Sequence, residues 1–221
     1  MNHNIAIDGP AGAGKSTIAK AVAKQKGYIY VDTGAMYRAM ALYLLQEGIG
    51  AQETEKIEAA CAMADISIDY QEGEQVVLLN GRNVNGLIRT EEVGNMASAS
   101  SVNPKVREKL VALQQKLAAE KSVVMDGRDI GTKVLPDATV KIYLTAGTGV
   151  RAKRRYEELA ARGEYCDIDA IEKDIAERDR RDMTRDISPL VQAEDAVLVD
   201  SSDMTVQDVV DMILEISETA T

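Results

Sequence analysis

The sequence predicts a mixed α/β fold in which a parallel sheet is flanked by helices. Short apolar runs alternate with segments whose apolar residues recur at helical spacing, from "NIAID" near the start to "TVQDVVDMILEIS" near the end. Strands that alternate with helices are typical of parallel sheets, which are buried on both faces. A glycine-rich turn joins the first strand to the first helix, and four strands end in acidic or small polar residues. Because such sheets bind ligands beyond the carboxyl ends of their strands, we expect the functional site at that edge.

The first half of the chain begins with the strand "NIAID", the helix "KSTIAKAVAKQKG", which Gly27 ends, and the strand "YIYVD". The run "AMYRAMALYLLQEG" places Met36, Met40 and Leu44 at helical spacing, and a further helix is expected over residues 54–64. Residues 66–89 differ, because they contain short β-rich runs separated by Gly and Asn turns. This pattern predicts a small antiparallel insert.

The second half returns to alternating helices and strands. The helix "NPKVREKLVALQQKLAAEK" opens with an Asn cap and a Pro at the first helical position, which is a strong start signal. The strands "SVVMD" and "TVKIYLTA" follow, and then two highly charged helices divided near "RGEYCDID". A last strand in "DAVLVDSS" and an amphipathic helix complete the predicted order.

Composition limits the classes of protein that the chain can belong to. A length of 221 residues predicts a single domain over residues 1–221, with residues 66–89 as its insert. The formal net charge of −10 disfavours nucleic acid as a partner, so any polyanion must meet a local basic cluster. Two distant cysteines favour a reducing compartment. With no membrane-spanning run and no visible signal peptide, we expect a cytoplasmic protein without a membrane partner. No long apolar stripe demands a dimer, so a monomer is expected.

Residues 9–16 fit the pattern G-x-x-x-x-G-K-[ST], with a strand before them and a helix after them. Glycines let backbone amides turn inward around phosphate oxygens, and the start of the helix adds its positive end. Lys15 is expected to reach the outer phosphates, and the Ser16 hydroxyl to ligate Mg²⁺. The alternative is a glycine-rich turn without a ligand. The complete motif in its required context favours a nucleoside triphosphate site, although it does not identify the reaction.

Three further clusters point to a second anion. Arg38 lies in the otherwise apolar helix that follows Asp32, where it is either an arginine that extends to the surface or a clamp on a phosphate. Arg128 follows the strand "VVMD" between two carboxylates, which fits a structural salt bridge or a site residue. In "AERDRRDMTRDISPL", Arg178, Asp182 and Arg185 share a helix face, which is either a solvated charged surface or a phosphate site. Arginine suits bidentate phosphate binding, and this stretch uses arginine rather than lysine.

Taken together, the motifs resemble those of the bacterial cytidylate kinases. The matching stretches are "IAIDGPAGAGKST", "DTGAMYR", "IRTEEVGNMAS", "PKVRE", "MDGRDIGTKVLPDA" and "ERDRRDMTR", in that order and over nearly the whole chain. The resemblance implies a P-loop nucleoside monophosphate kinase fold, with a parallel sheet core flanked by helices, a small β-rich acceptor-lobe insert and a short helical lid at residues 151–167. It implies transfer of the γ-phosphoryl group of ATP to CMP or dCMP in pyrimidine metabolism, with Mg²⁺ as cofactor.

The resemblance also assigns roles to individual residues. Arg38, Arg128 and Arg185 would hold the acceptor phosphate, Ser98, Arg107 and Asp129 would read the cytosine edge, and Arg178 and Asp182 would contact the pentose. The expected ATP-binding residues are Gly9, Pro10, Ala11, Gly12, Ala13, Gly14, Lys15, Ser16, Thr17, Arg154 and Arg155, with Arg162 as a further lid candidate. The expected CMP-binding residues are Thr33, Tyr37, Arg38, Ser98, Arg107, Arg128, Asp129, Arg178, Asp182 and Arg185. Lys15, Arg128 and Arg185 are the expected catalytic residues, and Ser16 is the expected metal ligand.

This inventory agrees with the chemistry of phosphoryl transfer, which needs positioning and neutralised charge more than a covalent group. The only histidine, His3, precedes the first strand, and no Ser-His-Asp set is visible. Two other functions stay open. One is a kinase of the same fold that acts on UMP, AMP or shikimate, and the other is a P-loop switch or motor that hydrolyses a nucleoside triphosphate without an acceptor. The chain lacks the guanine-reading N-K-x-D pattern of switches.

Overall fold

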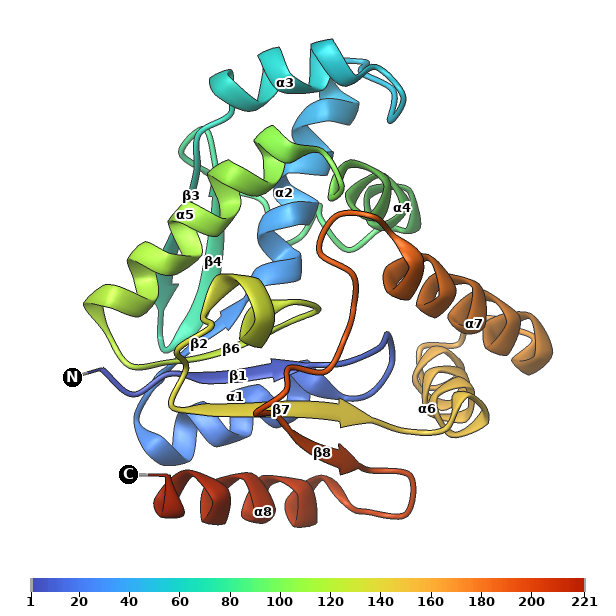
Figure 1. The fold of residues 1–221 in the computed structure, drawn as a ribbon. Helices are drawn as coiled ribbons and strands as arrows, with labels where there is room; N and C mark the ends of the chain where they lie inside the picture. The colour runs from blue at the N-terminus through green and yellow to red at the C-terminus, as the bar shows by residue number, and fades with distance from the viewer. Residues whose placement is uncertain (1, 221) are drawn as a thin grey trace. The chain divides into compact units, whose positions relative to one another are not determined.

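The computed structural model describes residues 2–220, and this part of the chain divides into two compact units. His3–Tyr28 and the residues from Val123 onward form the first unit, and Ile29–Ser122 with Asn2 form the second. Figure 1 shows the ribbon with the elements labelled. None of the described helices is long and apolar enough to cross a membrane.

The first unit is built on parallel strands in the order β6-β1-β7-β8, so the predicted parallel sheet is confirmed. These strands are β1 (Ile5–Asp8), β6 (Val123–Gly127), β7 (Val140–Thr145) and β8 (Val197–Asp200). The side chains of β1 are almost completely buried, as expected for a central strand that is covered on both faces. In the sheet register Asp8 lies beside Gly127 on one neighbour and Tyr143 on the other. The carboxyl ends of these strands therefore reach the same edge, as the sequence predicts.

Helices of the first unit pack on this sheet and on one another. They are α1 (Lys15–Lys26), α6 (Thr148–Ala161), α7 (Ile168–Thr184) and α8 (Val206–Thr219), with a short π-helix, η1 (Ile130–Val134). Helix α1 packs on β1, β6 and α8, whereas α6 and α7 pack on each other as a hairpin (Figure 1). Gly27 ends α1 in the left-handed conformation, and Thr205 and Asp208 form a capping box at the start of α8. The π-helix is an element that the sequence pattern did not predict.

The second unit holds the strand β2 (Ile29–Asp32), four helices and a small antiparallel sheet. The helices are α2 (Thr33–Gln46), α3 (Thr54–Met63), α4 (Glu91–Ser100) and α5 (Pro104–Glu120). Strands β3 (Ile66–Gln71), β4 (Glu74–Leu79) and β5 (Arg82–Asn83) pair antiparallel within the segment where the sequence predicts antiparallel strands. The Asn103 carboxamide accepts hydrogen bonds from the first turn of α5, which confirms the predicted start of that helix.

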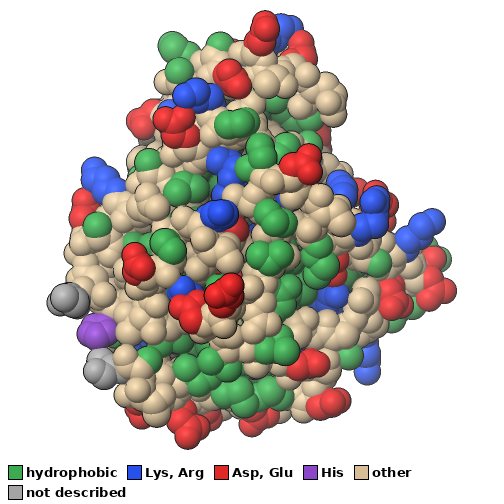
Figure 2. Space-filling view, in the orientation of Figure 1, with side chains coloured by type: hydrophobic (Ala, Val, Ile, Leu, Met, Phe, Trp, Pro, Cys, Tyr) green, Lys and Arg blue, Asp and Glu red, His purple; other side chains and the backbone are tan. Residues whose placement is uncertain are grey.

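Two further features are the distribution of charged side chains and the state of the cysteines. Figure 2 shows acidic side chains spread over one face of the molecule, with Lys and Arg side chains between them. Cys61 and Cys166 are both free thiols, and Cys61 is buried. The two cysteines therefore do not form a disulfide with each other.

Candidate active site

The P-loop, residues 9–16, joins β1 to α1 in the first unit. Gly9 has a φ of 152°, and a Cβ at this position would lie 1.9 Å from the carbonyl oxygen of Leu144, so only glycine fits. Gly14 is the left-handed N-cap of α1, and Lys15 is the first residue of the helix. The free N–H groups at the start of a helix attract anions. The backbone of the loop is therefore shaped as the sequence predicts for a phosphate site.

The Lys15 side chain is buried, and its Nζ donates a hydrogen bond of 2.7 Å to the carbonyl oxygen of Pro10. Burial and then the positive charge of Arg128 lower the pKa of Lys15 well below its ordinary value, and Arg178 acts in the same direction. The carboxylates of Asp126 and Asp8 oppose this shift in pKa. Lys15, Arg128 and Arg178 therefore form a convergent group of cations at the P-loop, which is suited to binding a highly charged anion.

Ser16 and Asp126 offer a pair of oxygen ligands beside the loop. The Ser16 hydroxyl donates a hydrogen bond of 3.0 Å to Oδ2 of Asp126, a buried residue of β6. Mg²⁺ prefers hard oxygen ligands and usually keeps several waters and substrate oxygens in its shell, so one hydroxyl and one carboxylate fit it. The sequence places Asp126 at a strand end but does not assign it to the metal site. Among the described residues no group of three or more His, Cys, Asp or Glu is arranged to hold a metal ion.

Asp8, the last residue of β1, binds the turn that follows β6. Its carboxylate accepts hydrogen bonds from the backbone N–H groups of Ile130 at 2.8 Å and Gly131 at 2.7 Å. Burial raises the pKa of Asp8 from 3.8 to about 6, although the two backbone hydrogen bonds oppose the shift. Arg128 and Asp129 lie in the turn that these bonds fix. Asp8 was noted in the sequence only as a strand end, and the structure shows what it binds.

The same turn meets helix α7 within the first unit. Arg128 Nε donates a hydrogen bond of 2.8 Å to Oδ2 of Asp182, and only 9% of the Asp182 side chain is exposed. From the sequence, Arg128 is either part of a structural salt bridge or a site residue, and in the structure its ion-pair partner is Asp182. Arg185 lies just beyond α7 in extended conformation, and its Nε donates to the carbonyl oxygen of Ser188. The helix that was expected to carry Arg178, Asp182 and Arg185 therefore carries only the first two.

The arginines expected in the lid lie on α6 or at its end, and each has a partner in the first unit. Arg154 donates to the hydroxyl and the carbonyl oxygen of Ser201, which follows β8. Arg155 and Arg162 are exposed, and both form ion pairs with Glu158. Their contact with ATP stays a prediction.

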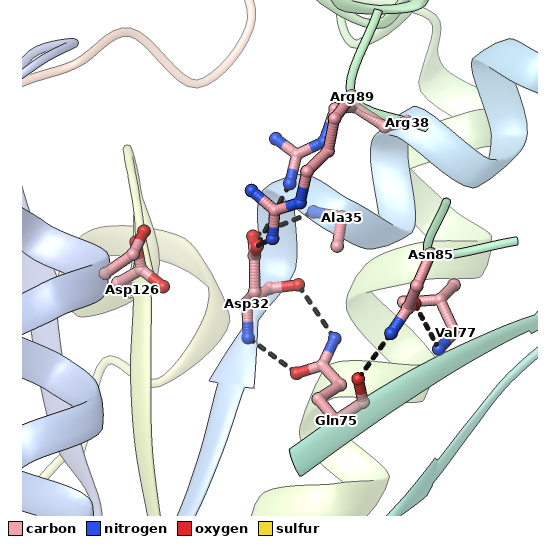
Figure 3. Close-up of polar contacts among 9 residues, drawn as sticks. Asp32, Ala35, Arg38, Gln75, Val77, Asn85, Arg89 and Asp126 are labelled. Carbon is pink, nitrogen blue, oxygen red and sulfur yellow. Dashed lines mark hydrogen bonds and ion pairs between the residues drawn. The ribbon is translucent and has the colours of Figure 1, made fainter. Parts of the chain in front are cut away.

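In the second unit Asp32 organises two arginines (Figure 3). As the N-cap of α2 it accepts a hydrogen bond from the N–H of Ala35, and its Oδ2 forms an ion pair of 3.0 Å with Arg38. Arg89 approaches the same oxygen at 3.9 Å and its side chain is 72% exposed, and no role was assigned to it from the sequence. The Nε of Arg38 is buried with no hydrogen-bond partner among the described residues. Two guanidinium groups thus share one carboxylate, which leaves net positive charge at the start of α2.

The insert is tied to the same point of the second unit. The Gln75 carboxamide accepts from the N–H of Asp32 at 2.8 Å and donates to its carbonyl oxygen at 3.2 Å (Figure 3). Asn85 in turn donates to the carbonyl oxygen of Gln75 and accepts from the N–H of Val77. Strand β4 and the loop after β5 are therefore fastened to the strand end that bears Asp32.

The other residues expected to bind CMP in this unit lie on α2 and on α4 and α5, which both pack against α2. Thr33 is the first residue of α2 and is buried, and Tyr37 lies one turn later. Ser98 lies on α4, and Arg107 is a buried residue of α5. A buried arginine on a helix needs polar partners, and the role of Arg107 in reading cytosine stays a prediction.

Comparison with known proteins identifies the family. The cytidylate kinase family model matches residues 5–219. A cytidylate kinase from Caldicellulosiruptor saccharolyticus is 52% identical over 213 residues, which cover 96% of this chain and 94% of the relative. A cytidylate kinase from Bacillus subtilis is 47% identical over 215 residues, which cover 97% of this chain and 96% of the relative. Both alignments run through the P-loop, the insert and the charged helices.

A comparison with solved structures supports the fold. An uncharacterized protein from Eubacterium ventriosum superposes with a TM-score of 0.57 at 13% identity, and the match covers 99% of each chain. Since identity this low shows the fold alone, the assignment depends on the family model and on the close relatives. A match over almost the entire length, together with the P-loop and the arginine pairs described above, shows that the chain belongs to the cytidylate kinase family.

Proposed function

We propose that the protein transfers the γ-phosphoryl group of ATP to CMP or dCMP, giving ADP and CDP or dCDP. The observation that carries the proposal is the group of cations at the P-loop, in which Arg128 and Arg178 lie close enough to Lys15 to lower its pKa. Lys15 is buried, and further positive charge close to a buried cation is costly unless an anion joins the group. Family membership supports cytidine monophosphate as the acceptor.

On the donor side, residues 9–17 bind ATP, the backbone N–H groups around the start of α1 hold its phosphates, and Lys15 neutralises the outer oxygens. Ser16 and Asp126 hold Mg²⁺, and Arg154 and Arg155 contact ATP from α6. When bound, Mg²⁺ supplies positive charge that offsets the charge developing on the transferred group. The protein adds no covalent step, so catalysis depends on position and charge.

On the acceptor side, we propose that Arg38, Arg128 and Arg185 bind the phosphate of CMP, and that Thr33 and Tyr37, at the start of α2, also contact CMP. The ion pairs of Arg38 with Asp32 and of Arg128 with Asp182 keep these guanidinium groups oriented before the substrate binds. Preorientation lowers the entropy that binding removes. Because Arg89 shares the Asp32 carboxylate with Arg38, it joins this group of phosphate-binding arginines.

Selection of the base depends on Ser98, Arg107 and Asp129. Cytosine carries an exocyclic amino donor where uracil has a carbonyl acceptor, so the Asp129 carboxylate favours cytosine and repels uracil. A buried polar mismatch of this kind costs about 1–3 kcal/mol. Arg178 and Asp182 contact the pentose. We therefore expect strong preference for CMP over UMP, without complete exclusion.

A panel of acceptors tests the proposal. ADP formation from Mg·ATP is followed with CMP, dCMP, UMP, AMP, shikimate or no acceptor. We expect rapid turnover with CMP and dCMP, slower turnover with UMP, and little hydrolysis without an acceptor. Equal rates with and without acceptor would favour a P-loop switch or motor, and preference for AMP or shikimate would favour another kinase of this fold. Omission of Mg²⁺ should remove the activity with every acceptor.

The remaining expectations concern the setting of the enzyme. We propose that it acts as a cytoplasmic monomer in pyrimidine metabolism, without nucleic acid or membrane as a partner. The net charge of −10 and the two free cysteines support this view. Light scattering on the purified protein measures the oligomeric state, and a mass near 23.9 kDa is expected.

A further inference from the structure

A buried ion pair joins helices α6 and α7 and contacts the P-loop. Arg151 of α6 and Asp179 of α7 lie with Nη1 and Oδ2 2.7 Å apart, and their side chains are only 5% and 11% exposed. Withdrawing two charges from water is costly, so a buried pair is not by itself a source of stability. The two side chains are expected to form further hydrogen bonds, and the groups that they bind indicate the role of the pair.

Both members of the pair bind the same residue of the P-loop. Arg151 Nη1 donates to the carbonyl oxygen of Ala11 at 2.8 Å, and the Ala11 N–H donates to Oδ1 of Asp179 at 3.3 Å. Ala11 is thus held through both of its backbone groups. At the next position, a Cβ on Gly12 would lie 3.4 Å from Cβ of Arg151 and 3.8 Å from Cδ1 of Ile175, so the loop also packs against both helices.

The rest of the Arg151 guanidinium is anchored to rigid backbone. Its Nε donates to the carbonyl oxygen of Ala146, just beyond β7, at 2.8 Å, and its Nη2 donates to the hydroxyl of Thr148 at 3.2 Å. The arginine therefore connects the end of a central strand, the start of α6 and the tip of the P-loop. The flat fork of arginine allows several directed bonds from one side chain, which lysine cannot reproduce.

The P-loop needs contacts from other elements, because its own glycines do not favour a single backbone conformation. Gly9, Gly12 and Gly14 have positive φ angles, and glycine gives the unfolded loop many alternative conformations. A loop that binds phosphate through backbone N–H groups must hold them convergent before the ligand arrives. We propose that Arg151 and Asp179 are positioning residues that hold the P-loop in the conformation that binds the triphosphate of the donor nucleotide.

Helix α7 carries both Asp179 and the residues proposed to contact the pentose. Asp179 directly follows Arg178 and lies one turn before Asp182, the partner of Arg128. The helix that holds Ala11 is thus the helix that carries the residues proposed to contact the pentose. The Arg151–Asp179 pair therefore fixes the P-loop relative to α7, and its loss is expected to affect the donor first.

The test compares two variants with matched controls, and its kinetic part rests on the kinase activity proposed above. Arg151→Met removes the fork, and Asp179→Asn removes the charge with almost no change in shape. Lys153→Met and Asp174→Asn remove the same charges from exposed positions on the same two helices. The dissociation constants of ADP and of CMP are measured separately by calorimetry, together with kcat, the KM for each substrate and the midpoint of thermal unfolding.

We expect the dissociation constant of ADP and the KM for ATP to rise about tenfold or more in both variants, because charge-assisted bonds that orient the loop are lost. CMP affinity should stay within about twofold of wild type, since the fork touches no residue proposed for the acceptor. The controls should resemble wild type. Arg151→Lys should fall between Arg151→Met and wild type, because it keeps the charge but loses the fork. Hydrogen exchange of the P-loop peptide should quicken in Asp179→Asn, in which the acceptor for the Ala11 N–H is weakened.

Unchanged ADP affinity in the folded variants would overturn the proposal. Equal loss of ADP and CMP affinity, accompanied by a lower unfolding midpoint, would also overturn it, because that is the signature of a general structural role. If Arg151→Met does not fold, the nearly isosteric Asp179→Asn decides the question. ADP titration and hydrogen exchange need no turnover, so they test the pair even if wild-type enzyme phosphorylates none of the acceptors, a result that would reject only the proposed function.

Discussion

At the scale of single residues, the feature most relevant to phosphoryl transfer is a set of buried ionisable side chains in the first unit. Lys15, Asp8, Asp126 and Asp182 are all buried, and buried charges are expensive unless paired or functional. Asp182 has an ion-pair partner in Arg128, and Asp126 accepts a hydrogen bond from Ser16. Lys15 and Asp8 instead have shifted pKa values, because burial opposes the charged form of each.

Replacement of Lys15 tests the donor side. We expect Lys15→Ala to lower kcat by at least about 10²–10³-fold, because the residue neutralises charge that develops in the transition state. The protein should stay folded, since the change removes a buried charge that donates a hydrogen bond to the nearby carbonyl of Pro10. Steady-state kinetics and circular dichroism measure the two effects. Activity close to wild type would remove the P-loop lysine from the mechanism.

Asp8 predicts a pH dependence of stability. Its folded-state pKa is raised to about 6, so the folded protein holds this proton more tightly than the unfolded chain does. The contribution of this group to stability is therefore greatest below its ordinary pKa and is lost as the pH rises through about 6. Between about pH 4 and about pH 7 it should lower the free energy of unfolding by about 2 kcal/mol.

The variant Asp8→Asn isolates this effect, because an amide does not titrate in this range. Urea unfolding of both proteins at several pH values gives the difference in free energy of unfolding. That difference, wild type minus variant, should fall as the pH rises, since Asp129 and Lys15 are the charged neighbours of Asp8 and burial outweighs both. A difference that rises with pH would show that the Asp8 carboxyl has a lowered pKa.

Asp182 is expected to distinguish ribose from deoxyribose. Asp182→Ala should reduce kcat/KM for dCMP because Arg128 loses its partner, and it should reduce kcat/KM for CMP further because a contact with the 2′-hydroxyl is also lost. A hydrogen bond to a charged group is worth about 1.5–3 kcal/mol, so the additional loss for CMP should be about tenfold or more. Equal losses for the two acceptors would leave Asp182 only its role in orienting Arg128.

At the scale of elements, strand ends and helix starts determine where functional groups lie. Helix α2 begins at the residue directly after β2, with Asp32 as its N-cap, so Arg38 in the second turn of the helix can pair with Asp32 at the strand end. The insert reaches the same point through Gln75. Helices α6 and α7 work in the same way for the P-loop, since one residue of each binds Ala11.

The attachment of the insert can be tested with Gln75→Leu. This change removes two hydrogen bonds to the backbone of Asp32, so we expect a loss of stability of about 1–3 kcal/mol and a higher KM for CMP. The KM for ATP should be unchanged, because the donor residues belong to the other unit. Thr205→Ala is a suitable control, since loss of the capping box of α8 costs about 1 kcal/mol and should leave both KM values unaltered. A KM for CMP that does not change would separate the insert from acceptor binding.

At the scale of the whole molecule, the order of strands and helices was predictable because each has a local signal. The Asn103-Pro104 start, the left-handed Gly27 and the alternation of elements are all written in short stretches of sequence. The P-loop was predictable for the same reason. Arg38 and Arg128 were recognised as cations in unusual places. The partner of Arg38, Asp32, lies 6 residues away, whereas the partner of Arg128, Asp182, lies 54 residues away and no local pattern identifies it.

The features that sequence reasoning missed depend on tertiary contacts. Asp8 binds N–H groups 122 and 123 residues away, and no local pattern predicts such partners. Arg151 resembled any other basic residue of a charged helix until its contacts with Ala11 and Asp179 were visible. The π-helix over Ile130–Val134 has no propensity signal of its own, and such turns are frequent at functional sites. Arg185 was expected on the same helix as Arg178 but lies just beyond the end of α7. Periodicity alone does not define where a helix ends.

The central claim is that one nucleotide's phosphoryl group passes directly to another nucleotide. ATP labelled at its γ-phosphate is incubated with Mg²⁺, CMP and the enzyme, and the products are separated chromatographically. We expect the label to appear in CDP and little inorganic phosphate to form. Label found in inorganic phosphate, in the same amount with and without CMP, would contradict this claim.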